Sequence, residues 1–140
     1  GVLRVDKVSV PNPTSIRLGH YALPENDGTP VKESTSAKVP GATIISNGEY
    51  SLAMVNLTDW NKTSVLHPEG IHPVSSTCGL IMNEKQVQKE EVMVTLMLWK
   101  KGKKSFSKKE LTPVKSIKVS DDKKSVEIVM ADKTVKKVTF

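Results

Sequence analysis

The chain has 140 residues, a formal net charge of +6, 37% apolar and 4% aromatic residues, and a single cysteine. This length fits one domain with its own core, and the lone Cys78 excludes both a disulfide within the chain and a zinc site built on several cysteines. No apolar run approaches the roughly 18 residues of a membrane-spanning helix, and the apolar content is too high for a disordered chain.

Alternation of apolar and polar residues predicts extended structure over most of the N-terminal half. Pro11 and Pro13 stop the first extended segment, because proline cannot donate to a strand ladder. Residues 24–40 are polar and predict a long surface connection with one short strand near Val31. Asn47-Gly48 predicts a type I′ hairpin turn. The strands expected in this half span residues 2–10, 14–23, 43–45 and 50–57.

The middle of the chain alternates between irregular and strongly apolar stretches. Residues 58–78 contain two His-Pro steps and predict an irregular loop. A short strand is expected over residues 79–82, and Asn-Glu-Lys at 83–85 predicts a turn. Residues 92–99, Val-Met-Val-Thr-Leu-Met-Leu-Trp, form the most apolar run and predict a strand buried on both faces.

The last third predicts one helical turn and three regular strands. Ser107 and Glu110 have the spacing of a capping box, which favours a helical turn within 106–111. The strands are expected at 114–119, 125–130 and 135–140, joined by turns at 121–124 and 131–134. Within the second of these strands, Val126, Ile128 and Met130 face one way, and Ser125 and Glu127 face the other. Taken together, the pattern predicts an all-β fold, an antiparallel β-sandwich of roughly eight to ten short strands, forming a single domain over residues 1–140.

Charge is divided unevenly along the chain. Residues 1–80 carry 6 basic and 7 acidic side chains, whereas residues 81–140 carry 15 basic and 8 acidic ones, and every basic residue of the second part is lysine. Nucleic-acid readers normally use arginine and aromatic residues as well, so no nucleic-acid partner is predicted. A solvated surface that protects strand edges is one interpretation, and a face for an acidic polysaccharide is the other. The predicted glycan-binding lysines are Lys100, Lys101, Lys103 and Lys104.

Trp60 is the predicted sugar platform. It lies between Asp59 and Asn61, and an exposed indole beside amide and carboxylate groups is suited to stacking on a sugar and bonding its hydroxyls. The alternative is that Trp60 plugs one end of the sandwich. Trp99 ends the apolar run and is expected in the core or at its rim.

Two histidines, His67 and His72, lie five residues apart on the predicted loop. They could share a metal or a sugar with Glu69 or Cys78, whereas the alternative is that they cap strand ends or lie exposed. His20 and Tyr21 form a further polar pair of the kind used as base and acid, and Cys78 is expected to be a small buried residue. No catalytic residue, metal site or cofactor is predicted from these patterns.

A resemblance covers residues 79–140. A strand ending in Trp99-Lys-Lys-Gly-Lys is followed by Pro113-Val-Lys-Ser-Ile-Lys-Val, then Asp121-Asp-Lys-Lys-Ser-Val-Glu-Ile, and finally Lys136-Lys-Val-Thr-Phe. This order resembles the C-terminal β-sandwich of bacterial heparinase II/III-like polysaccharide lyases and related Bacteroidetes glycan-degrading proteins. The resemblance implies a periplasmic or extracellular bacterial location and a supporting role, and it transfers no catalytic residue.

We therefore predict a non-catalytic accessory β-sandwich of an exported bacterial polysaccharide-processing protein. Its expected partners are a neighbouring catalytic domain of the same polypeptide and an acidic polysaccharide. Gly1 in place of methionine indicates a piece of a longer protein. The alternatives are a small metal- or His-dependent enzyme that uses the loop with His67 and His72, and an adhesion module that pairs with another protein through a strand edge.

Overall fold

The computed structural model of the chain describes residues 1–21, 32–35, 39–46, 50–66, 80–102 and 105–140. The described part is almost entirely antiparallel β-structure, which confirms the predicted all-β class. It contains eleven strands in three sheets, one more strand than the upper end of the predicted range. A single helical turn, α1 (Lys108–Leu111), precedes the last three strands.

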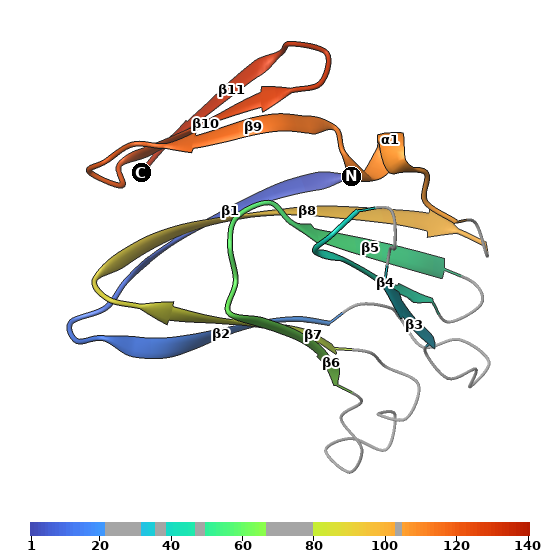
Figure 1. Cartoon of the computed structure of the whole chain (residues 1–140), viewed down its shortest axis with the longest axis horizontal. Helices are drawn as coiled ribbons and strands as arrows, with labels where there is room; N and C mark the ends of the chain where they lie inside the picture. Colours follow the sequence, from blue (N-terminus) through green and yellow to red (C-terminus); the bar gives the residue numbers. More distant parts are fainter. Residues whose placement is uncertain (22–31, 36–38, 47–49, 67–79, 103–104) are drawn as a thin grey trace.

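The three sheets are stacked in layers. The central sheet has the order β1 (Val2–Ser9), β8 (Glu90–Lys101), β5 (Tyr50–Asn56), β4 (Ala42–Ser46) and β3 (Lys32–Thr35). One outer sheet, here the C-terminal sheet, consists of β9 (Val114–Val119), β10 (Ser125–Met130) and β11 (Val135–Thr139). The other outer sheet has the order β2 (Thr14–Tyr21), β7 (Leu80–Val87) and β6 (Lys62–Leu66). Figure 1 shows the central sheet between these two.

The strand β8 joins the layers because both of its faces are buried. Val92 and Val94 pack with Val126 and Ile128 of the C-terminal sheet. Met97, three residues beyond Val94, lies on the opposite face, in the cluster that holds residues of β4, β5 and β7. Successive side chains of a strand point to opposite faces, so a run of eight apolar or weakly polar residues supplies two cores at once. The predicted doubly buried strand is confirmed, with its ends extended to Glu90 and Lys101.

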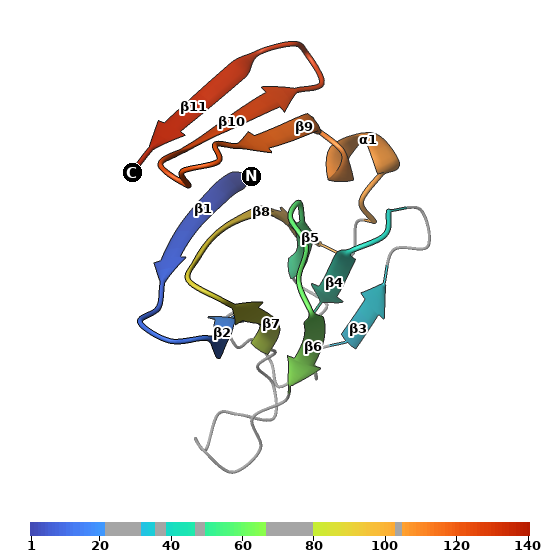
Figure 2. The same cartoon turned by 60° about the vertical axis from the view of Figure 1, so that its left-hand side comes forward.

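The prolines that end the first strand lie where the chain passes from one sheet to another. β1 pairs with β8 in the central sheet, and the next strand, β2, pairs with β7 in the outer sheet. The backbone N–H of Val10 donates to the carbonyl oxygen of Lys89 at 2.9 Å, at the point where both chain segments change sheet. Pro11 and Pro13 fit this corner because they have no N–H to leave unpaired. Figure 2 shows both segments bending around the same edge.

Two predictions in the middle of the chain are wrong. The expected turn at 83–85 lies inside β7, which runs without interruption to Val87. The expected irregular stretch 58–78 contains β6 from Lys62 to Leu66. Asn83 looks like a turn residue in the sequence, but its side chain is fully buried and bonded to Asn56 and Thr63. A buried polar side chain can occupy the interior of a strand when its hydrogen-bonding groups are paired in this way.

Several other expectations agree with the described residues. The short strand expected near Val31 is β3, and β4 and β5 form the expected hairpin, with Ser46 opposite Ser51; the turn at Asn47-Gly48 lies outside the described residues. In β10 the even-numbered residues pack inward, and Glu127 is exposed. The two C-terminal turns contain Lys123 and Lys133 at φ 55° and 70°, the left-handed region that tight turns often need.

Candidate functional site

Most of the net charge of the chain lies in one short stretch. Residues 100–111, here the basic segment, contain six lysines and one glutamate, which amounts to +5 of the total +6. The segment begins at the end of β8 and finishes with α1, which lies above that end of the central sheet in Figure 1. The lysine surplus is therefore a local feature of one end of the fold.

Lys100 connects the start of the basic segment to residues near its end. Its Nζ lies 2.6 Å from Oε1 of Glu110 and donates to the carbonyl oxygen of Ser105 at 3.2 Å. The same ammonium group lies 5.0 Å from the centre of the Phe106 ring, within the range of a cation–π contact. With this many internal partners, Lys100 acts as a positioning residue rather than as a free cation. The glycan contact expected for Lys100 from the sequence stays a prediction.

The helical turn is fixed by the predicted capping box. The backbone N–H of Ser107 donates to Oε2 of Glu110 at 2.8 Å, and the backbone N–H of Glu110 donates to the Ser107 hydroxyl at 3.3 Å. Phe106 and Leu111 are buried in the cluster that also contains Leu96 of β8. These contacts anchor the second half of the basic segment, residues 106–111.

The carboxyl of Glu110 is held in its ionised form. The hydrogen bond from Lys100 is the largest cause, followed by those from the backbone and hydroxyl of Ser107, and together they lower its pKa from 4.5 to about 2. Because the folded-state pKa lies below the unfolded value, the ionised group favours folding above pH 4.5. That contribution is lost as the pH falls through about 2.

We expect NMR titration of the Glu110 carboxyl to show a midpoint near pH 2 in the unaltered chain. In Lys100→Met the midpoint should rise toward 4.5, because the strongest partner of the carboxylate is removed. Lys108→Met is the matched control, since it removes a neighbouring charge that is not hydrogen-bonded to Glu110 in the described residues. Equal midpoints in the two variants would contradict the assignment of Lys100.

Within the described part of the basic segment, the exposed cations are Lys101, Lys108 and Lys109. Among the described residues, none of these three belongs to an ion pair. Lys103 and Lys104, the other two predicted glycan ligands, lie outside the described residues. The basic segment thus presents at least three ammonium groups to solvent on an anchored backbone.

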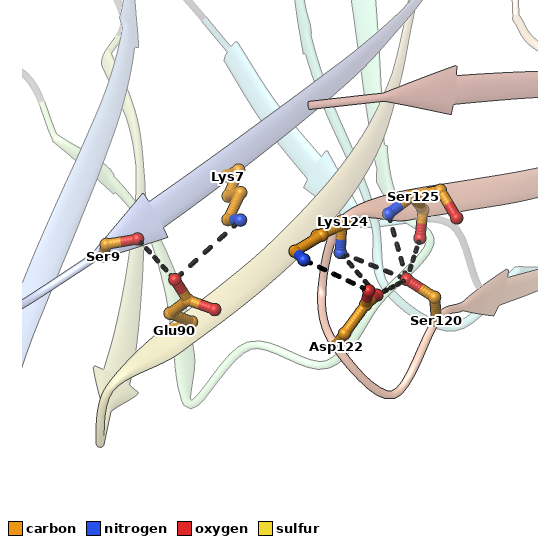
Figure 3. A network of polar contacts seen from close by, with 7 residues as sticks. All are labelled: Lys7, Ser9, Glu90, Ser120, Asp122, Lys124 and Ser125. Atoms are coloured by element: carbon orange, nitrogen blue, oxygen red, sulfur yellow. Dashed lines mark hydrogen bonds and ion pairs between the residues drawn. The ribbon is translucent and has the colours of Figure 1, made fainter.

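Near the ends of β1 and β8 and the turn between β9 and β10, lysines form ion pairs with carboxylates. Nζ of Lys7 lies 3.8 Å from Oε1 of Glu90, and the same oxygen accepts from the Ser9 hydroxyl at 3.2 Å (Figure 3). Nζ of Lys124 lies 3.9 Å from Oδ2 of Asp122. The pKa of Asp122 is lowered, first by the hydrogen bond from Ser120 and then by the backbone N–H of Lys124. An anion approaching this corner would meet carboxylates as well as lysines.

Close by, Nζ of Lys123 lies 3.8 Å from Oε1 of Glu91, an ion pair that links the C-terminal sheet to β8. The lysines at this corner therefore serve contacts within the chain. Compared with the lysines at this corner, the exposed Lys101, Lys108 and Lys109 are the better anion-binding candidates.

The Trp60 segment connects two layers. Asp59, Trp60 and Asn61 lie between β5 and β6, so the chain crosses here from the central sheet to the outer one. The side-chain oxygen of Asn61 accepts from the backbone N–H of Gln86 at 2.6 Å, and Lys85 Nζ donates to the carbonyl oxygen of Asp59 at 2.7 Å. Trp60 is half-buried, and its indole N–H is buried without a hydrogen-bond acceptor in the described structure. These features favour the interpretation that the Trp60 side chain fills one end of the sandwich. Its role as a sugar-stacking residue stays a prediction.

The structure separates the two halves of the predicted site. Asn56, just before the Trp60 segment, pairs with Thr95, whereas Tyr50 at the start of β5 pairs with Lys101. The two halves lie at opposite ends of a seven-residue strand, about 20 Å apart. Trp60 therefore lies away from Lys100 and Lys101, the two predicted lysines within the described residues. The exposed tryptophan beside the lysines is Trp99, with 55% of its surface exposed, which places it at the rim.

The catalytic alternatives fall mostly outside the described residues, as is the case for His67, Glu69, His72 and Cys78. His20 and Tyr21 lie at the end of β2, opposite Ile81 and Leu80 of β7. Within the described ranges, no three His, Cys, Asp or Glu side chains gather as metal ligands. No helix in that part of the chain has the length and hydropathy needed to cross a bilayer.

No protein-family model, curated protein or solved structure matches this chain. The heparinase-like resemblance of residues 79–140 therefore stays a prediction from the sequence. What is shown for the chain is an antiparallel all-β fold of three layers with one strongly basic end.

Proposed function

We propose that this chain is a non-catalytic accessory β-sandwich of an exported bacterial polysaccharide-processing protein, and that its basic segment holds an acidic glycan. The observation that carries the proposal is the set of exposed ammonium groups on Lys101, Lys108 and Lys109, free of ion pairs in the described residues, on a backbone anchored by Lys100 and Glu110. The resemblance of residues 79–140 supports the exported bacterial setting and the supporting role beside a catalytic domain.

Lysines suit a polymeric anion better than a single small ligand. Each ammonium is a hydrated point charge without the fixed fork geometry of arginine, so one contact contributes little affinity and little specificity. A polyuronate or sulfated polysaccharide presents many anionic groups along one chain, so several weak contacts can form at once. Binding of this kind should be strongly sensitive to salt.

We expect the chain to be retained on immobilised polygalacturonate or heparin at about 10 mM NaCl. It should be released at about 1 M NaCl, because the screening length there is only about 3 Å. It should pass through a neutral dextran column at either salt concentration. The triple variant Lys101→Ala, Lys108→Ala, Lys109→Ala should weaken binding by about tenfold or more, because it removes three exposed contacts.

The matched control removes three exposed lysines of the C-terminal sheet, Lys115, Lys118 and Lys137, and so changes the net charge equally. It should bind nearly as well as the unaltered chain. Equal losses in the two triple variants would show that only net charge matters, and retention by neither acidic polymer would remove the glycan-binding role. A duplex DNA column tests whether another polyanion is held as well.

A further inference from the structure

We propose that Trp99 and Lys101 form a subsite for one acidic sugar unit, on the face of the central sheet that points toward β2, β7 and β6. The sugar would stack on the indole, and its carboxylate or sulfate would meet the ammonium of Lys101. This proposal rests on the proposed function and concerns Lys101 among the three exposed lysines, because α1 packs on the opposite face of the central sheet.

The register of β8 places both side chains on one face. Met97 packs in the cluster with Leu52, Met54 and Ile81, which defines the face toward β7. Trp99 and Lys101 follow at intervals of two residues in an unbroken strand, so they share that face. Their Cα atoms are about 7 Å apart along the strand, about the span of one sugar ring with its exocyclic acid.

The neighbouring strand completes the subsite. Leu52 lies directly opposite Trp99, and Tyr50 lies directly opposite Lys101. Leu52 is only 8% exposed, so Trp99 stands beside a buried apolar neighbour while more than half of its own surface is exposed. Tyr50 is half-buried and lies diagonally across from Trp99. An aromatic surface next to an ammonium group is therefore built from regular strand positions.

Exposed apolar surface gathers around Trp99. Val2 of β1 lies opposite Met97, so it occupies the same face, and it is 45% exposed. Val2, Met97 and Trp99 thus form a continuous apolar strip that is only partly covered, at the end of the sheet where the basic segment begins. Contiguous exposed apolar surface of this kind marks binding sites more often than isolated apolar residues do.

Lys101 decides which partner fits the strip. It lies two residues beyond Trp99 on the same face, and burying its ammonium group in a protein interface would be costly, since lysine is depleted at interface cores. An acidic sugar pairs with it while remaining largely hydrated. The apolar C–H face of the sugar covers the indole, so one ligand both stacks on Trp99 and pairs with the ammonium group.

Titration of the full chain with polygalacturonate and with heparin tests the subsite. Trp99→Ala should raise the dissociation constant for the preferred polymer by about tenfold, the effect of losing about 55 Å² of buried apolar surface. Trp99→Phe should lose less, because it retains a smaller ring. Lys101→Ala should weaken binding and flatten its dependence on salt, whereas Trp99→Ala should leave that dependence unchanged. Val135→Ala is the matched control, as Val135 is 56% exposed on the C-terminal sheet.

Fluorescence separates the two tryptophans. In Trp60→Phe, where Trp99 is the remaining indole, adding the polymer should change the emission; in Trp99→Phe it should not. Preference for polygalacturonate identifies a carboxylate ligand, and preference for heparin a sulfate, and either result supports the subsite. If the unaltered chain binds but Trp99→Ala binds equally well, the subsite is overturned while the proposed function stands. If the unaltered chain binds neither polymer, both proposals fail.

Discussion

Ile128→Ala is expected to lower the free energy of unfolding by about 2–5 kcal/mol. Ile128 is 1% exposed and packs in the cluster that contains Val126 of its own strand and Val92 and Val94 of β8. Removing its outer carbons would open a cavity at the contact between the C-terminal sheet and the central sheet. Close packing on both sides leaves little room for the neighbours to relax into that cavity.

Urea unfolding followed by circular dichroism measures this loss. Val135→Ala is the control on the same sheet, and because Val135 is 56% exposed we expect a change within about 0.5 kcal/mol. Amide hydrogen exchange adds a local readout, since β9, β10 and β11 should lose protection more than β7 does. Equal changes for the two substitutions would mean that the C-terminal sheet does not depend on this contact.

The second large effect is expected at Asn83. Its side-chain oxygen accepts from Nδ2 of Asn56 at 3.1 Å and from the hydroxyl of Thr63 at 2.7 Å, and its own Nδ2 donates to Oδ1 of Asn56 at 3.1 Å. Asn83→Ala leaves polar groups of both partners unpaired between two sheets. We expect a loss of about 2–3 kcal/mol in the free energy of unfolding, which the same urea experiment measures.

Two further variants sharpen this test. Asn12→Ala removes an exposed asparagine and should change stability by no more than about 0.5 kcal/mol. Asn83→Asp keeps the shape but buries a carboxyl, whose pKa would rise because burial disfavours the ionised form. Its deficit should therefore grow as the pH rises above about 4, the ordinary pKa of aspartate. A deficit that does not vary with pH would contradict the burial of this position.

The alternation of residues determined which parts of the fold could be predicted. The strand β8 and the inward face of β10 follow from local side-chain patterns, and α1 follows from the spacing of Ser107 and Glu110. The error at residues 83–85 has a non-local cause. The partners that make Asn83 acceptable inside a strand are 20 and 27 residues away, so an Asn-Glu-Lys triplet alone could not reveal them.

The candidate site was predictable in part for the same reason. The lysines of residues 100–104 stand out in the sequence, but the engagement of Lys100 with Glu110 depends on how the chain folds back over β8. From their neighbours in the sequence, Trp60 is the predicted sugar platform, and Trp99 is expected in the core or at its rim. Trp60 lies among polar residues yet is half-buried, whereas Trp99 ends an apolar run yet is exposed, two residues before the end of β8.

The pairing of the first strand with a strand late in the chain bears on how the protein folds. Val2 lies opposite Met97, so β1 can complete its ladder only after more than half of the polypeptide is available. The C-terminal sheet, in contrast, is built from two consecutive tight hairpins. Long-range pairing carries a larger loop-closure cost than local pairing, and so folds more slowly. In refolding of the full chain we therefore expect the three C-terminal strands to form early and the central sheet to close late. During synthesis β1 stays unpaired until β8 has been made, and the charged side chains of Arg4, Asp6 and Lys7 help to keep this strand from aggregating.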